Sequence, residues 1–161
     1  MSSESALHVD DDGFVLLVAP DTYRGFVSES WTLDEILSHF VAQMNRASLF
    51  VAHPGPDAAD EPLALETAPS ARTAKRDASG VIEVGLQGLW LTDYAQLTMA
   101  AQYEDEPPIT EWGSTRLPAE PGRYRIQLRE LSEGDPTYVL TLTPDEAEIG
   151  EIGEIQSVPW F

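Results

Sequence analysis

The sequence predicts a mainly β fold of the α+β class: a single antiparallel β-sandwich-like domain, residues 1–161, with one amphipathic helix. Short apolar or alternating segments recur along the chain, Gly and Pro turns separate them, and only one stretch has a helical period. A length of 161 residues is typical of one domain. Several short strands with a single helix bury their apolar faces most simply as two packed sheets.

The first half of the chain contains three predicted strands. Residues 14–19 (FVLLVA) follow an Asp12-Gly13 turn signal and are continuously apolar, which predicts a buried strand. Residues 23–28 predict a second short strand, and residues 48–52 a third that ends at a Pro-Gly-Pro turn.

A helix is predicted over residues 33–46. Thr32 is followed three residues later by Glu35, the spacing of a capping box in which each side chain accepts a backbone N–H at the helix start. The apolar residues of the segment share one stripe, so that one face packs on a core. They are Leu33, Ile36, Leu37, Phe40, Val41 and Met44.

Residues 57–80 have a different composition. They are rich in Ala, Pro, Asp, Ser and Thr, and their only large apolar residues are Leu63 and Leu65. This composition predicts a long loop or partly disordered insertion, with a short strand at residues 63–66 as an alternative inside it.

The second half is consistently β in pattern. Residues 81–86, 88–92 and 94–103 predict strands, with a helix left open for the last of them. Residues 123–129 alternate apolar residues with arginines and predict a hairpin with residues 137–143. Residues 144–161 are interpreted as an acidic C-terminal tail.

The charge is unusual for a domain of this size. Asp and Glu number 28 against 9 Lys and Arg, a net charge of −19. Residues 1–80 hold 13 acids and 5 bases, and residues 81–161 hold 15 and 4, so that a tail alone does not explain the excess. Such a surface repels phosphates, which disfavours direct binding to nucleic acid or to an anionic membrane and favours a basic protein partner. Adaptation to a salty cytoplasm is an open alternative.

No catalytic or metal motif is present. The absence of Cys excludes cysteine nucleophiles, zinc fingers and iron–sulfur clusters. Nucleophile-elbow, P-loop and dinucleotide fingerprints are missing. We expect His8 in a flexible leader, His39 on the polar side of the helix and His53 in a Pro/Gly loop, and the three share no ligand spacing. The run of residues 10–13 (DDDG) lacks the alternating ligands of a calcium loop and is interpreted as a solvated turn. We therefore expect no catalytic residue, cofactor or metal.

These observations favour a non-catalytic acidic binding protein. Its form would be an inhibitor or immunity-type protein whose carboxylates mimic nucleic-acid phosphates against a basic partner. The residues that we expect to bind the partner are Glu104, Asp105, Glu106, Trp160 and Phe161, which are a charged Pro-flanked loop and two large apolar residues at the end of the chain.

Two other functions remain open at this stage. One is a small-ligand or carbohydrate-binding β-domain that uses tryptophans and the arginines Arg123, Arg125 and Arg129, although pairing with cross-strand carboxylates is the simpler role for these bases. The other is an assembly subunit held by the tail. No secretory signal or apolar span long enough for a bilayer is visible, which predicts a cytoplasmic location. The oligomeric state does not follow from the sequence.

Overall fold

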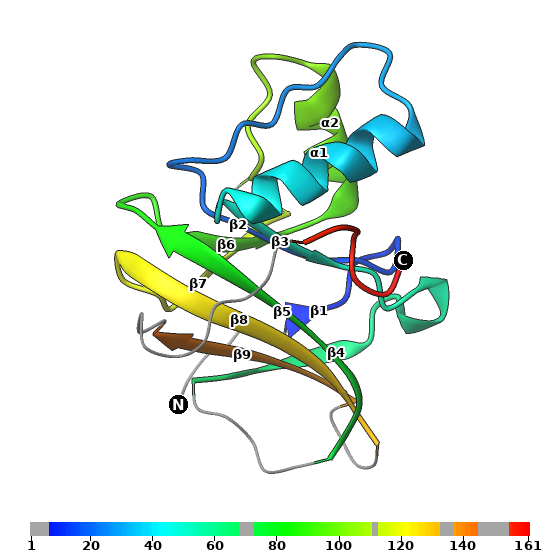
Figure 1. Cartoon of the computed structure of the whole chain (residues 1–161), viewed down its shortest axis with the longest axis vertical. Coiled ribbons are helices and arrows are strands. Elements are labelled where there is room, and N and C mark those ends of the chain that lie inside the picture. The colour runs from blue at the N-terminus through cyan, green and yellow to red at the C-terminus, as the bar shows by residue number, and fades with distance from the viewer. Residues whose placement is uncertain (1–6, 68–72, 111–112, 133–136, 145–154) are drawn as a thin grey trace.

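Two β-sheets and two α-helices make up the described part of the computed structural model, which covers residues 7–67, 73–110, 113–132, 137–144 and 155–161 (Figure 1). In chain order the elements are β1 Leu7–His8, β2 Val15–Val18, α1 Leu33–Asn45, β3 Leu49–Ala52, the 3-10 turn η1 Pro56–Ala58, β4 Pro62–Glu66, β5 Ala74–Val84, β6 Leu89–Thr92, α2 Tyr94–Gln102, β7 Thr115–Leu117, β8 Gly122–Leu131 and β9 Tyr138–Pro144. The predicted mainly β, α+β fold is confirmed.

The sheets have five and four strands. The five-stranded sheet has the order β1-β4-β9-β8-β5, and the four-stranded sheet has the order β3-β2-β6-β7. The hairpin of β8 and β9 is the predicted one, with Ile126 opposite Leu142 and Leu128 opposite Leu140. The pairing differs from the purely antiparallel expectation at one place, because β4 and β9 run parallel. A parallel pair needs a long connection, and the chain from β5 to β8 supplies it.

The four-stranded sheet is the middle layer of the molecule. The two helices lie on one side of it and the five-stranded sheet lies on the other (Figure 1). Every residue of β2 and of β3 is buried, as expected for strands that are covered on both faces. This placement explains why residues 14–19 are continuously apolar, whereas Ile126 and Leu128 of β8 alternate with less buried polar residues.

The helix α1 begins as predicted. Thr32 Oγ1 accepts the backbone N–H of Glu35 at 3.3 Å, and Glu35 Oε1 accepts that of Thr32 at 3.0 Å. Ile36, Phe40 and Met44 are buried. None of the helices in the described residues is long and apolar enough to cross a membrane.

Residues 94–103 are mainly a helix and not the strand that was favoured. The side chain of Asp93 accepts the backbone N–H of Gln96 at 2.7 Å and caps α2. The helix then consists mostly of good helix formers and buries Leu97 and two alanines. The single-helix prediction is therefore wrong.

The short strand offered at residues 63–66 is present as β4, whereas the loop predicted for the rest of residues 57–80 is wrong where the first half of β5 lies. The buried positions of this part of β5 are Ala78 and Gly80, too small to give an apolar signal. A Cβ at Gly80 would lie 2.8 Å from Cδ1 of the fully buried Phe50 in β3. The small residue is needed because the two sheets approach closely here.

Three smaller predictions also change. Residues 23–28 are not a strand; their N–H groups at Val27 and Ser28 donate to the carbonyl of Ala101 and hold the segment against α2. His8 belongs to β1 and pairs with Pro62, where a flexible leader was expected. In the predicted acidic tail, Pro144 ends β9, residues 145–154 lie outside the described residues, and residues 155–161 pack back on the domain.

We expect Gly80→Ala to destabilise the fold by about 1–3 kcal/mol, because the added methyl group overlaps a ring that has no free space. Urea unfolding followed by circular dichroism measures the change. Ser79→Ala, the neighbouring position on the other face of β5, is the control and should stay within about 0.5 kcal/mol. The double variant Phe50→Leu with Gly80→Ala should be destabilised by less than the sum of the two single variants. A destabilisation equal to that sum would contradict the contact.

Candidate functional site

The candidate site is a cleft of about 250 Å³ at the meeting point of the β1–β2 loop and the start of α2. Five of its lining residues are aspartates, namely Asp10, Asp11, Asp12, Asp60 and Asp93. The other lining residues are Leu7, His8, Val9, Leu91, Thr92, Ala95, Gly113 and Thr115. We call this feature the acidic cleft.

Asp10 organises the cleft. Its Oδ1 accepts the backbone N–H groups of Asp12 at 3.0 Å and Phe14 at 2.7 Å, and its Oδ2 accepts that of Tyr94 at 2.7 Å. One carboxylate therefore closes the β1–β2 loop and joins it to the first turn of α2. Partial burial raises the pKa of Asp10, although the three hydrogen bonds oppose this shift. The interpretation of residues 10–13 as a solvated turn is wrong for Asp10 and correct for the exposed Asp11 and Asp12.

The chain segments on either side of the cleft are held by backbone geometry. Gly13 has φ +80°, and a Cβ there would overlap the carbonyl of Gly55. Asp60 also has a positive φ, +65°, and its N–H donates to the carbonyl of Val9 at 3.1 Å. Asp and Asn tolerate this left-handed conformation better than most residues do. This backbone conformation and the hydrogen bond to Val9 place the Asp60 side chain beside the β1–β2 loop.

The carboxylates of the cleft repel one another. A side-chain hydrogen bond with Asp60 raises the pKa of Asp11, and the negative charges of Asp60, Asp12 and Asp93 raise it further. Neighbouring negative charges disfavour the ionised form of Asp11. The fold thus maintains a local concentration of negative charge against an electrostatic cost.

The basic residues are placed elsewhere. Of the described residues that line the acidic cleft, none is Lys or Arg. β5 and β8 carry five of the eight described bases, which are Lys75, Arg76, Arg123, Arg125 and Arg129. Arg123 forms an ion pair with Glu83 across these strands at 3.1 Å. In the described part of the chain, no group of three or more His, Asp or Glu side chains is arranged to hold a metal ion.

The acidic turn predicted to bind a partner follows α2 in the chain and folds back to Gln96 in the first turn of that helix. Glu104 and Asp105 are exposed, and Glu106 is half-buried with its Oε2 3.5 Å from Nε2 of Gln96. The backbone N–H of Gln96 is accepted by Asp93 of the acidic cleft at 2.7 Å, so Gln96 links Glu106 to the cleft.

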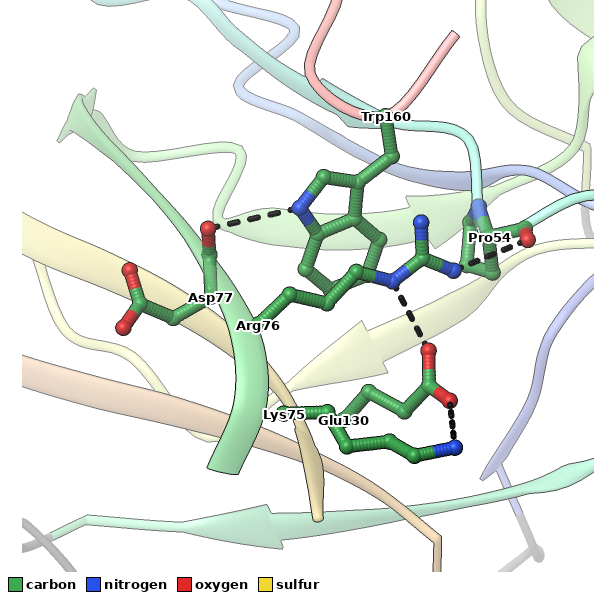
Figure 2. Close-up of polar contacts among 6 residues, drawn as sticks. All are labelled: Pro54, Lys75, Arg76, Asp77, Glu130 and Trp160. Carbon is green, nitrogen blue, oxygen red and sulfur yellow. Dashed lines mark hydrogen bonds and ion pairs between the residues drawn. The ribbon is translucent and has the colours of Figure 1, made fainter. Parts of the chain in front are cut away.

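Trp160 docks on its own chain (Figure 2). The guanidinium carbon of Arg76 lies 4.1 Å from the centre of the indole ring, and the indole N–H donates to the carbonyl of Asp77 at 3.3 Å. Arg76 is itself held, since its Nε donates to Glu130 Oε1 at 2.7 Å and its Nη2 to the carbonyl of Pro54 at 3.0 Å. Lys75 reaches the other oxygen of Glu130 at 3.6 Å.

Further contacts fix the last residues of the chain. The side-chain amide of Asn45 exchanges two hydrogen bonds with the backbone of Ile155, at 3.0 and 2.8 Å. Phe161 stays 58% exposed, and its ring centre lies 4.9 Å from that of His53 and 6.2 Å from that of Phe14. Phe14 stacks on Tyr94 at 4.5 Å, so Phe161 lies at the edge of the aromatic group next to the acidic cleft.

The other residues considered in the sequence have structural partners. The indole N–H of Trp90 donates to the carbonyl of Gln87 at 2.8 Å, and Trp112 lies outside the described residues. His39 Nε2 lies 3.3 Å from the hydroxyl of Tyr23, and burial lowers the pKa of His39. Burial likewise lowers the pKa of His53.

Two residues of the acidic cleft, Asp60 and Asp93, escaped the sequence analysis because they are far from Asp10 in the chain. For Asp93 a signal existed: Gln96 follows it at the spacing of a capping box, which places Asp93 at a helix start. For Asp60 no local pattern pointed to the cleft.

Comparison with known proteins supports the fold. No family model matches the chain, and no curated protein sequence matches it. The structure is similar to that of a protein described as "Crocagin biosynthetic gene J", with a TM-score of 0.53 and 13% identity over 91% of this chain and 100% of the other. This likeness shows a shared fold.

A weaker similarity is to ComJ from Bacillus subtilis, described as an inhibitor of the DNA degrading activity of NucA. The TM-score is 0.45 and the identity 9%, over 88% of this chain and 98% of ComJ. A TM-score at this level does not establish a common fold.

Neighbouring aspartates should respond in opposite ways to substitution. We expect Asp10→Ala to destabilise the protein by about 1–3 kcal/mol, because it leaves three backbone donors without their acceptor. Asp11→Asn should raise the melting temperature at neutral pH, because it removes repulsion with Asp60. Thermal unfolding followed by circular dichroism measures both.

The pH dependence gives a check on Asp11. An acid whose pKa is raised in the folded state destabilises the fold when it is ionised. The destabilisation by Asp11 is therefore fully present above its folded pKa, and it disappears as the pH falls below about 3.8, the ordinary pKa of Asp. The gain from Asp11→Asn should therefore be largest near pH 7 and shrink in acid. A gain that is independent of pH would contradict the repulsion.

Arg76 and Lys75 share Glu130 and provide a matched pair for the C-terminal contact. We expect Arg76→Ala to cost about 1–2 kcal/mol, since it removes the stacking on Trp160 together with two hydrogen bonds. Acrylamide should then quench tryptophan fluorescence more strongly. Lys75→Ala, at a side chain that is 63% exposed, should change stability by less than about 0.5 kcal/mol. Equal effects of the two substitutions would show that Trp160 does not depend on Arg76.

Proposed function

We propose that this chain is a non-catalytic acidic binding protein whose acidic cleft takes a basic side chain of a protein partner. The observation that carries the proposal is the gathering of five aspartates around one cleft, with no Lys or Arg among its described lining residues. Repulsion from neighbouring carboxylates, which raises the pKa of Asp11, agrees with this arrangement. Arrangements that cost stability persist in folds where function requires them. A cation bound in the cleft would relieve this repulsion. The relief would contribute favourably to the free energy of binding.

An arginine fits the cleft by size and chemistry. Asp11 and Asp60 offer carboxylate oxygens from two different loops, and a guanidinium donates several hydrogen bonds in a fixed plane to such acceptors. The backbone that carries these carboxylates is already held by Asp10 and by the hydrogen bond from Asp60 to Val9, so binding needs little further ordering.

The finer form of the proposal is an inhibitor or immunity-type protein that occupies a nucleic-acid-binding site. A partner built to hold phosphates presents Lys and Arg, and a row of carboxylates can stand where those phosphates would lie. The net charge of −19 would speed the encounter by attracting such a surface from a distance.

The turn with Glu104, Asp105 and Glu106 is proposed as a second, weaker contact. Two of its three side chains are exposed to solvent, and they are not gathered around a cleft as the aspartates of the acidic cleft are. Solvated charges at the rim of an interface contribute mainly to the rate of association.

Two triple variants with equal charge changes test the proposal. One is Asp11→Asn with Asp12→Asn and Asp60→Asn, and the other is Glu104→Gln with Asp105→Asn and Glu106→Gln. The immobilised proteins are used to capture partners from a lysate of the source organism, with washes at about 50 and about 500 mM salt. The captured basic protein is then purified, and its affinity for each variant is measured by calorimetry.

We expect the cleft variant to lose affinity at least tenfold and the turn variant to lose less, with duplex DNA competing for the partner. Equal losses in the two variants would mean that binding follows net charge alone. Retention of many basic proteins, each released at high salt, would show that the acidity is a general surface property and would overturn the proposal.

A further inference from the structure

A second cleft, of about 400 Å³, lies between α1 and the C-terminal segment. Its apolar lining comes from Leu37 and Val41 of α1 and from Val158 and Phe161 of the segment. Asp34, Ser38, Gln156 and Ser157 complete the lining. We call this feature the apolar groove.

The apolar groove is open and its walls are held in place. Leu37 and Val41 are one helical turn apart on α1, and the exposed Leu33 extends the same stripe by another turn. The opposite wall is fixed by the two hydrogen bonds between Asn45 and Ile155 and by the stacking of Trp160 under Arg76. An apolar surface kept open by a rigid support is typical of a binding site.

The groove is linked to the acidic cleft through a chain of aromatic contacts. Phe161 lines the groove and contacts Phe14, and Phe14 stacks on Tyr94, whose backbone N–H is held by Asp10 of the cleft. Asp34 is the one charged residue among those that line the groove, and Glu35 beside it is also exposed. The α1 wall of the groove therefore carries acidic side chains, and these match a basic segment that carries an apolar side chain.

We propose that the apolar groove binds an apolar side chain of the same basic partner segment whose Arg or Lys enters the acidic cleft. This inference rests on the proposed function. The groove supplies what the cleft cannot, because burial of an apolar side chain is insensitive to screening by salt.

Two synthetic peptides of equal charge serve as probes. One alternates Arg and Gly over ten residues, and the other is the same peptide with one central Gly replaced by Leu. We expect the Leu peptide to bind roughly tenfold more tightly in calorimetry, as burial of one large aliphatic side chain implies. Leu37→Gln should abolish this difference and leave the affinity for the Gly peptide unchanged. Leu86→Gln is the control, because Leu86 is 86% exposed and lies outside the groove.

A second variant covers the case in which Leu37→Gln fails to fold. Ser38 is an exposed lining residue, so Ser38→Phe should fill the groove without opening the core and should give the same loss of the Leu effect. The cleft variant Asp11→Asn with Asp12→Asn and Asp60→Asn should weaken both peptides.

The outcomes separate the two proposals. Equal binding of both peptides, lost in the cleft variant, would overturn the groove and leave the proposed function standing. Absence of binding by either peptide would count against both. A Leu effect that survives Leu37→Gln and Ser38→Phe would place the apolar contact elsewhere and overturn the groove. Sedimentation that shows a dimer broken by Leu37→Gln would assign the groove to a second copy of the chain and overturn the partner proposal.

Discussion

The structure depends on the burial of β2 on both faces. In a strand that is polar on one face, the alternation of polar and apolar residues fixes the register. Val15–Val18 is apolar throughout, so its pattern does not fix the register of β2. Polar contacts at the two ends of β2 fix it instead. At the start, Asp10 holds Phe14 and Tyr94; at the end, the N–H of Ala19 donates to the carbonyl of Ser48. The carboxylate that builds the acidic cleft is thus also one that positions the central strand.

Basic and acidic side chains are concentrated in different parts of the fold. The long antiparallel ladder of β5 and β8 places side chains directly opposite one another, and Arg123 and Arg76 find Glu83 and Glu130 across it. These bases are occupied with local acids on that sheet. The acidic cleft has no Lys or Arg among its described lining residues, so its aspartates are not neutralised by a base of the cleft wall.

The sequence was sufficient for features that depend on local patterns. The capping box of Thr32 and Glu35, the apolar run of β2 and the β8–β9 hairpin are all present. It failed where a distant contact decides the outcome. Gly80 gives no strand signal, because a glycine is required there by the close approach of Phe50 in the other sheet. The acidic cleft could not be found because Asp10, Asp60 and Asp93 come together only in the folded chain.

In the proposed recognition of a basic partner, the acidic cleft and the apolar groove have complementary roles. Charge attraction acts over a distance and is shared by many basic proteins, so the cleft by itself favours fast association with weak selectivity. An apolar groove acts only on contact and depends on shape. Phe161 borders the groove and contacts the aromatic residues behind the cleft, so a partner has to present the two chemistries at a fixed spacing. That requirement would let a surface with a charge of −19 discriminate among basic proteins.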